Sequence, residues 1–142
     1  MSKKVKVPDR LYVRKVDLES YKLLNKERSS FLNGKENKEL FIMAMVYGFL
    51  RGNRLKLDKK EGFIREEYLK DEYRTVMKAL AMKEEGGLEV LLNPQKVYSI
   101  AEEYAAGGIG YLKNDVFNKK EGSYVKRLEE LLVNLYDKIN KK

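Results

Sequence analysis

The chain has 142 residues, of which 37% are charged, and a net charge of +8 at pH 7. It contains neither cysteine nor histidine, which excludes disulfides, a thiol nucleophile and the commonest zinc ligands. Its length suits one domain with a hydrophobic core of its own. The run from Leu40 to Leu50 is too short to cross a bilayer, so we expect a cytoplasmic protein with no membrane partner.

The basic charge is concentrated in the first two-fifths of the chain. Residues 1–60 hold 16 Lys and Arg against 7 Asp and Glu, whereas residues 61–142 hold 14 against 15. Such asymmetry favours a polyanionic partner that meets one end of the molecule. A solvated surface rich in Lys and Glu, typical of thermophilic proteins, is the alternative.

Residues 1–10 predict a basic arm that could move. Lysine and valine alternate from Lys4 to Val7, which is typical of a short strand or an extended segment. Pro8 limits such a strand to a few residues or to a sheet edge. No apolar segment follows the charged start, so we do not expect a signal peptide. Asp17 is a good N-cap for a first short helix.

Residues 37–51 predict the central helix of the fold. No side chain from Leu40 to Leu50 is charged or strongly polar, and a helix that is apolar all round must be buried on every side. Gly52 suits its C-terminal end. Gly48 lies inside the helix at a cost of about 1 kcal/mol relative to alanine, which indicates a close crossing by another element.

The second half of the chain predicts three further helices. Leu55 to Ile64 is compatible with a small hairpin or an irregular loop, and both stay open. Apolar spacing predicts a helix over residues 66–83 that Gly86-Gly87 stops. Asn93-Pro94 predicts the start of the next helix, which Gly107-Gly108 is expected to end as a C-cap. A connection with one helical turn should then lead to a last helix.

These elements indicate a mainly α fold. We expect a single compact domain over residues 1–142, with about five helices around the central helix and at most a short N-terminal strand or small hairpin. Residues 122–142 should form a charged C-terminal helix. The apolar spacing over residues 123–140 predicts an intramolecular face, and a homodimer seam is the alternative, because only about two heptads are present.

The basic residues near both ends of the first half predict a phosphate-binding surface. Contacts of this kind give an affinity that is independent of sequence and sensitive to salt. In the alternative, Arg51 merely caps its helix and the lysines are solvated. The candidate nucleic-acid-binding residues are Lys3, Lys4, Lys6, Arg10, Arg14, Lys15, Arg51, Arg54, Lys56, Lys59 and Lys60.

No pattern in the sequence predicts catalysis, a metal site or a cofactor. Glu84-Glu85 and Glu102-Glu103 are helix neighbours, whose side chains point to different faces and make poor acid–base pairs. The glycines from Gly107 to Gly110 follow a helix and precede no Lys-Ser/Thr pair, unlike a nucleotide loop. Among the ten tyrosines, Tyr12 and Tyr111 are expected to be the more exposed.

Several short motifs carry a family resemblance. Phe41 to Phe49 fits an F-x-x-A-x-x-x-G-aromatic helix, Gly52 to Leu57 a basic G-x-R-x-x-L turn, and Ala105 to Gly108 an A-x-G-G ending. On these motifs the chain resembles the DNA phosphorothioation-associated (dnd system-associated) protein 4 family over roughly residues 3–112. The helix after Phe117 would lie outside the resemblance. Membership implies an accessory part in prokaryotic systems that replace a non-bridging phosphate oxygen of DNA with sulfur, or that restrict unmarked DNA.

Three functional hypotheses follow. The first is a non-enzymatic accessory protein of a DNA modification or restriction system, which binds DNA backbone or a DNA-bound partner protein through its basic half. The second is a ribbon-helix-helix regulator, in which Lys4 to Val7 would pair with a twin strand and enter the major groove. The third is a protein-interaction module that never touches DNA.

Overall fold

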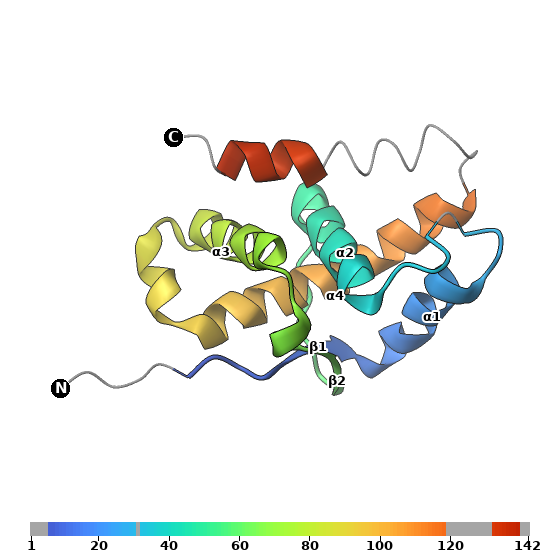
Figure 1. Cartoon of the computed structure of the whole chain (residues 1–142), viewed down its shortest axis with the longest axis horizontal. Helices are drawn as coiled ribbons and strands as arrows, with labels where there is room; N and C mark the ends of the chain where they lie inside the picture. The colour runs from blue at the N-terminus through green and yellow to red at the C-terminus, as the bar shows by residue number, and fades with distance from the viewer. Residues whose placement is uncertain (1–5, 31, 119–131, 140–142) are drawn as a thin grey trace.

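A computed structural model describes residues 6–30, 32–118 and 132–139, and over these residues the chain is mainly α (Figure 1). Its main elements are β1 (Arg10–Arg14), α1 (Leu18–Lys26), α2 (Asn37–Arg51), β2 (Lys60–Arg65), α3 (Asp71–Glu85) and α4 (Pro94–Asn118). Short 3-10 helices are η1 (Lys15–Asp17), η2 (Glu66–Tyr68) and η3 (Leu88–Leu92). With a helix over residues 132–139, the described part has five α-helices and one small sheet, which confirms the predicted fold class.

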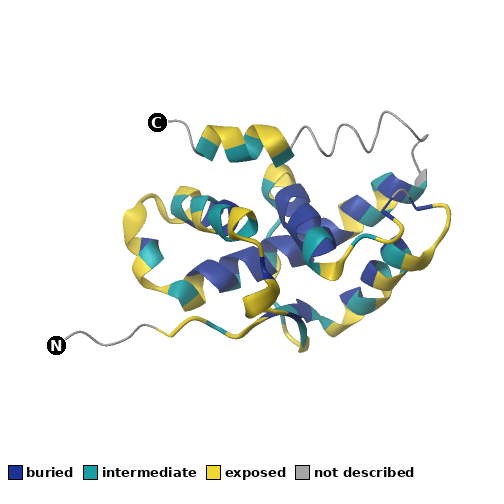
Figure 2. Cartoon of the chain, viewed as in Figure 1, coloured by how far each residue is buried: buried dark blue, intermediate teal, exposed yellow. Residues whose placement is uncertain are grey.

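The core is built where α2 crosses α4. Every residue of α2 from Leu40 to Gly48 is buried, and Figure 2 shows the middle parts of α2 and α4 as mostly buried. A Cβ on Gly48 would lie 1.9 Å from the carbonyl oxygen of Tyr104 in α4. The predicted limits of the central helix and the predicted close crossing at Gly48 are both confirmed.

α4 is one continuous helix, so the prediction that it ends at Gly107-Gly108 is wrong. Both glycines lie on the surface that meets α2 and the loop after it. A Cβ on Gly107 would lie 1.9 Å from the Asn53 carbonyl oxygen, and one on Gly108 1.9 Å from that of Ala44. The glycines therefore permit close packing, and the residues expected to form a connection continue the helix.

Helix ends follow the expected chemistry in most places. The Glu36 backbone N–H donates to Glu39 Oε1 over 3.0 Å at the start of α2. Gly52 and Gly86 end α2 and α3 with φ of 66° and 80°, the left-handed region that glycine adopts without strain. Asn93 Oδ1 accepts the Lys96 N–H over 3.2 Å at the start of α4.

The start of α3 differs from the prediction. The regular helix begins at Asp71, five residues later than expected, because Glu66–Tyr68 form η2. Glu66 Oε2 accepts hydrogen bonds from Arg74 Nε at 2.7 Å and from the Tyr98 hydroxyl at 2.6 Å. Glu66 therefore ties η2 to α3 and α4 instead of opening the helix.

β1 and β2 form an antiparallel sheet, with Arg10 opposite Arg65 and Arg14 opposite Lys60. Lys4 to Val7 were expected to form a short strand or an extended segment: residues 6–8 have no regular structure, and residues 1–5 lie outside the described part. The strand lies after Pro8, where buried Leu11 and Val13 alternate with polar residues. The sequence of Leu55 to Ile64 was compatible with either a hairpin or an irregular loop. This segment overlaps β2, which pairs with the distant β1.

The helix over residues 132–139 packs on the rest of the molecule. Leu132, Leu135 and Tyr136 lie against the hydrophobic core, as the intramolecular interpretation of this segment predicts. Residues 123–131 and 140 of the predicted helix lie outside the described part, and the homodimer seam stays a prediction. Within the described residues, no helix combines the length and apolarity that a bilayer span requires.

Candidate nucleic-acid interface

The outer face of the sheet carries cations from both strands. In β1, Leu11 and Val13 point into the core, which leaves Arg10 and Tyr12 on the other face. The Arg10 side chain lies across Gly62 of β2, where a Cβ would be 2.9 Å from Arg10 Cδ. Lys60 Nζ lies 4.8 Å from the centre of the Tyr12 ring. The glycine and the tyrosine thus help to position the two charges.

Two more lysines continue this charge at the end of the sheet. The Lys15 N–H donates to the Lys59 carbonyl oxygen over 2.9 Å, so the two residues are neighbours. Both side chains are exposed, as are those of Arg10 and Lys60. We call these four residues the cationic surface. None of them forms an ion pair with a carboxylate of a described residue, although the charge of Lys60 acts on the buried Glu102 from a longer distance.

Arg14 belongs to an internal ion pair. Its Nε and Nη2 donate to the two carboxylate oxygens of Asp17 over 2.8 and 2.9 Å. This hydrogen bonding to Asp17 raises the pKa of Arg14 further. Asp17 occupies the N-cap position of α1, as predicted, but its side chain makes no hydrogen bond to the helix. The pair fixes the turn after β1 and leaves Arg14 little freedom to bind phosphate.

Arg54 is also engaged internally. Its Nε lies 2.6 Å from Glu103 Oε1 and its Nη1 3.1 Å from Glu84 Oε2. The guanidinium is 5.8 Å from the centre of the Tyr104 ring, whose hydroxyl donates to Glu84. Arg54 therefore ties the loop after α2 to both α3 and α4.

The remaining candidates lie apart from that bridge. Arg51 is exposed and stacks over Tyr111 of α4, 4.7 Å from the ring centre. Lys6 and Lys56 are exposed, while Lys3 and Lys4 lie outside the described residues. The structure thus groups Arg10, Lys15, Lys59 and Lys60. Arg14, although it lies opposite Lys60 in the sheet, and Arg54 are instead held in internal ion pairs.

Arg54→Ala is expected to lower the free energy of unfolding by about 1–3 kcal/mol, because Glu84 and Glu103 lose their shared partner. Lys56→Ala, which removes an exposed cation two residues later, should change it by no more than about 0.5 kcal/mol. Urea denaturation of both variants measures the difference. Equal effects would show that the bridge contributes nothing beyond a surface charge.

A buried carboxylate lies behind the cationic surface. Glu102 is only 8% exposed, and its Oε2 accepts the backbone N–H of Tyr12 over 2.8 Å. Burial raises the pKa of Glu102 to about 7, although the hydrogen bond from Tyr12 and the charge of Lys60 oppose the rise. Glu103 turns to Arg54 instead, as expected for helix neighbours. Glu102 therefore fastens the edge of β1 to α4.

Two residues near the sheet were not among the predicted candidates. Arg65, opposite Arg10, is exposed, and its contact with Glu67 is long at 3.8 Å. Tyr68 is 59% exposed, against 39% for Tyr111, and Tyr12 is half-buried beneath Lys60. The expectation that Tyr12 and Tyr111 are the exposed tyrosines thus missed Tyr68. The apolar residues Phe63 and Ile64 before Arg65 were compatible with a strand, but the sequence did not show that this strand pairs with β1.

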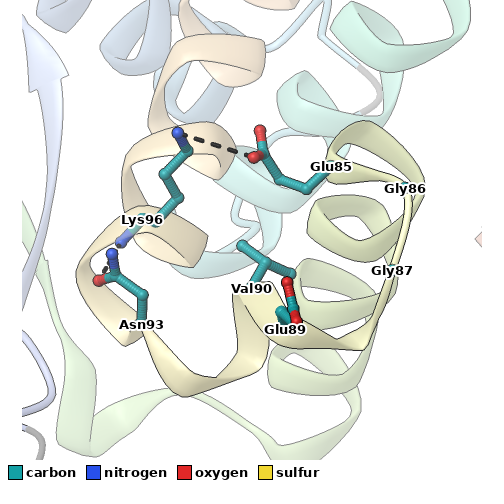
Figure 3. A pocket seen from close by; sticks show the side chains of 7 residues that line it. All are labelled: Glu85, Gly86, Gly87, Glu89, Val90, Asn93 and Lys96. Carbon is teal, nitrogen blue, oxygen red and sulfur yellow. Dashed lines mark hydrogen bonds and ion pairs between the residues drawn. The ribbon is translucent and has the colours of Figure 1, made fainter.

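A concave region lies at the corner between α3, η3 and α4, with a volume of about 430 Å³ (Figure 3). Lys96, Glu85 and Asn93, three of its polar residues, make contacts within the turn itself. Lys96 Nζ lies 3.7 Å from Glu85, and Asn93 caps α4. Glycines 86 and 87 form the opposite rim. These contacts explain the corner as a structural turn between two helices.

Comparison with protein families gives one result. The family model described as DNA sulphur modification system-associated protein 4 matches residues 18–142. The chain belongs to this family. No curated protein and no solved structure matches it.

The match to the DNA sulphur modification system-associated protein 4 family confirms the resemblance but shifts its limits. The C-terminal segment after Phe117, expected to lie outside, is part of the match. Residues 1–17 precede it, so β1, Arg10 and Lys15 are not covered. Lys59 and Lys60 lie within the matched range. The cationic surface therefore combines residues that the family model covers with residues that it does not.

Proposed function

We propose that the chain is a non-enzymatic accessory protein of a DNA sulphur modification system that binds the DNA backbone in the cytoplasm. The observation that carries the proposal is the cationic surface: four exposed cations from two distant segments, with no ion pair to a carboxylate of a described residue. Clustered Lys and Arg on one face are the electrostatic footprint of nucleic-acid binding. Family membership favours DNA over other polyanions.

The strand pairing favours this proposal over a ribbon-helix-helix regulator. Such a regulator would use Lys4 to Val7 as the strand that pairs with its twin, but residues 6–8 have no regular structure and residues 1–5 lie outside the described part, so β1 is the first strand of the described residues. Here β1 already pairs with β2 of the same chain. At the other edge of β1, the Tyr12 N–H is bonded to Glu102. A partner protein of the same system, which the family name suggests, is the second candidate for the cationic surface.

Binding of a labelled DNA duplex at several salt concentrations tests the proposal. We expect affinity to fall steeply with salt, because phosphate contacts release counterions. Arg10→Ala combined with Lys60→Ala should weaken binding and reduce the log–log salt slope by about two. The matched control replaces Lys78 and Lys83, two exposed lysines of α3, and removes the same charge elsewhere.

Two results would refute the proposed function. One is the absence of binding at low salt by the unaltered protein. The other is an equal loss of affinity and salt slope in the control pair and in the Arg10/Lys60 pair, which would mean that only net charge matters. Sequence-specific binding would instead favour a regulator.

A further inference from the structure

A hollow of about 410 Å³ lies beside the sheet, between the start of α2 and the segment formed by β2 and η2. Glu36, Asn37 and Lys38 line it on the α2 side, and Phe63, Arg65 and Tyr68 on the other. Its size falls within the range of small-ligand sites. Aromatic, cationic, amide and carboxylate side chains therefore meet in one concave place, where Glu36 is paired with Lys38 over 3.6 Å.

Tyr68 gives this hollow a free aromatic surface. The side chain is 59% exposed, and its ring has no aromatic or cationic neighbour among the described residues. The backbone of the residue is nevertheless held, because Lys38 Nζ donates to the Tyr68 carbonyl oxygen over 3.1 Å. Phe63 is anchored by Tyr21, 4.6 Å away between ring centres. The side of the hollow formed by Phe63 and Tyr68 is thus held in place, and the Tyr68 ring is accessible to a ligand.

Arg65 connects the hollow to the cationic surface. It lines the hollow and pairs with Arg10 across the sheet. Its ion pair with Glu67 is long, and both side chains are about 60% exposed, so the pair is weak and easily exchanged for a phosphate. A nucleic-acid strand with phosphates on Arg10 and Arg65 would pass the mouth of the hollow.

We propose that this hollow accepts an unpaired nucleobase from a DNA strand held on the cationic surface. The inference rests on the proposed function. The base would stack on Tyr68, since every base presents a π-face to an aromatic ring. The exposed Asn37 amide both donates and accepts hydrogen bonds, so it can meet the polar edge of a base. The chemical class is a nucleobase of single-stranded or gapped DNA.

The test compares the affinity for three labelled DNAs of equal length: an intact duplex, a duplex with a short gap of unpaired bases, and the same gapped duplex with abasic residues in the gap. The abasic DNA is as flexible as the gapped DNA but offers no base. The unaltered protein should bind the gapped DNA about tenfold more tightly than the other two. Tyr68→Ala should abolish this preference without changing the affinity for the intact duplex, whereas Tyr68→Phe should keep it.

The outcomes separate this inference from the proposed function. Three results would overturn the base site but leave backbone binding intact. They are equal affinity for gapped and abasic DNA, a preference for gapped DNA that survives in Tyr68→Ala, and an equal loss of affinity for all three DNAs in Tyr68→Ala. Failure to bind any of the three DNAs at low salt would overturn both. Circular dichroism of the Tyr68 variants checks that they are folded.

Discussion

Gly108→Ala is expected to destabilise the protein by at least about 3 kcal/mol, at or above the usual cost of overpacking a core. The added Cβ would lie 1.9 Å from the Ala44 carbonyl oxygen and 2.3 Å from the Gly48 nitrogen. Both are backbone atoms of α2, so no side-chain rotation relieves the overlap. The two helices can accept the methyl group only by moving apart, which opens the core.

Gly110→Ala in the same helix is the matched control. Gly110 is exposed, and a Cβ there meets nothing within 4 Å. Alanine has the higher helix propensity, so this substitution should stabilise the protein by up to about 1 kcal/mol. Denaturant unfolding of both variants gives the comparison. Similar free energies of unfolding for the two variants would disprove the close crossing.

Glu102→Gln is expected to remove a large pH dependence of stability. Burial raises the pKa of Glu102 from about 4.5 to about 7, so between these values the folded state binds more protons than the unfolded state. The contribution of this carboxyl to the free energy of unfolding is therefore complete below pH 4.5 and is lost as the pH rises through 7. A shift of this size corresponds to about 3 kcal/mol. Above pH 8, the variant should be more stable than the unaltered protein by up to that amount.

Urea denaturation from pH 5 to pH 8.5 measures this difference. In the Glu102→Gln variant the side-chain amide oxygen can still accept the Tyr12 N–H, so the main change is the loss of the ionisable group. Glu89→Gln, at an exposed position, should leave the pH profile unchanged. If the Glu102→Gln profile matches that of the unaltered protein, another group carries the pH dependence.

The α2–α4 crossing illustrates how far sequence patterns reach. The apolar run and Gly48 were enough to predict a buried helix and a close neighbour. Gly107-Gly108 form the other side of the same crossing, although their pattern predicts a helix end. Two glycines after an apolar helix satisfy either a left-handed cap or a close approach. Only the position of α2, some 60 residues earlier, decides between them.

The candidate site shows the same limit. Arg51, Arg54 and Lys56 are close in sequence, but Arg54 turns towards Glu103, 49 residues later. Exposed Lys15 and Lys59 are far apart in sequence, and the strand register brings them together. Charge composition thus predicted the basic half of the chain, while long-range pairing determines which of its cations are available.

The loop between α2 and β2 is fastened along its length. Asn53 Nδ2 donates to the Gly107 carbonyl oxygen over 2.9 Å, and the Leu55 N–H donates to that of Glu103 over 3.0 Å. The Lys59 carbonyl oxygen accepts the Lys15 N–H at the other end. The backbone that carries Lys59 and Lys60 is consequently ordered before any ligand arrives. Binding should cost little backbone conformational entropy, so the free energy of the phosphate contacts should appear largely as affinity.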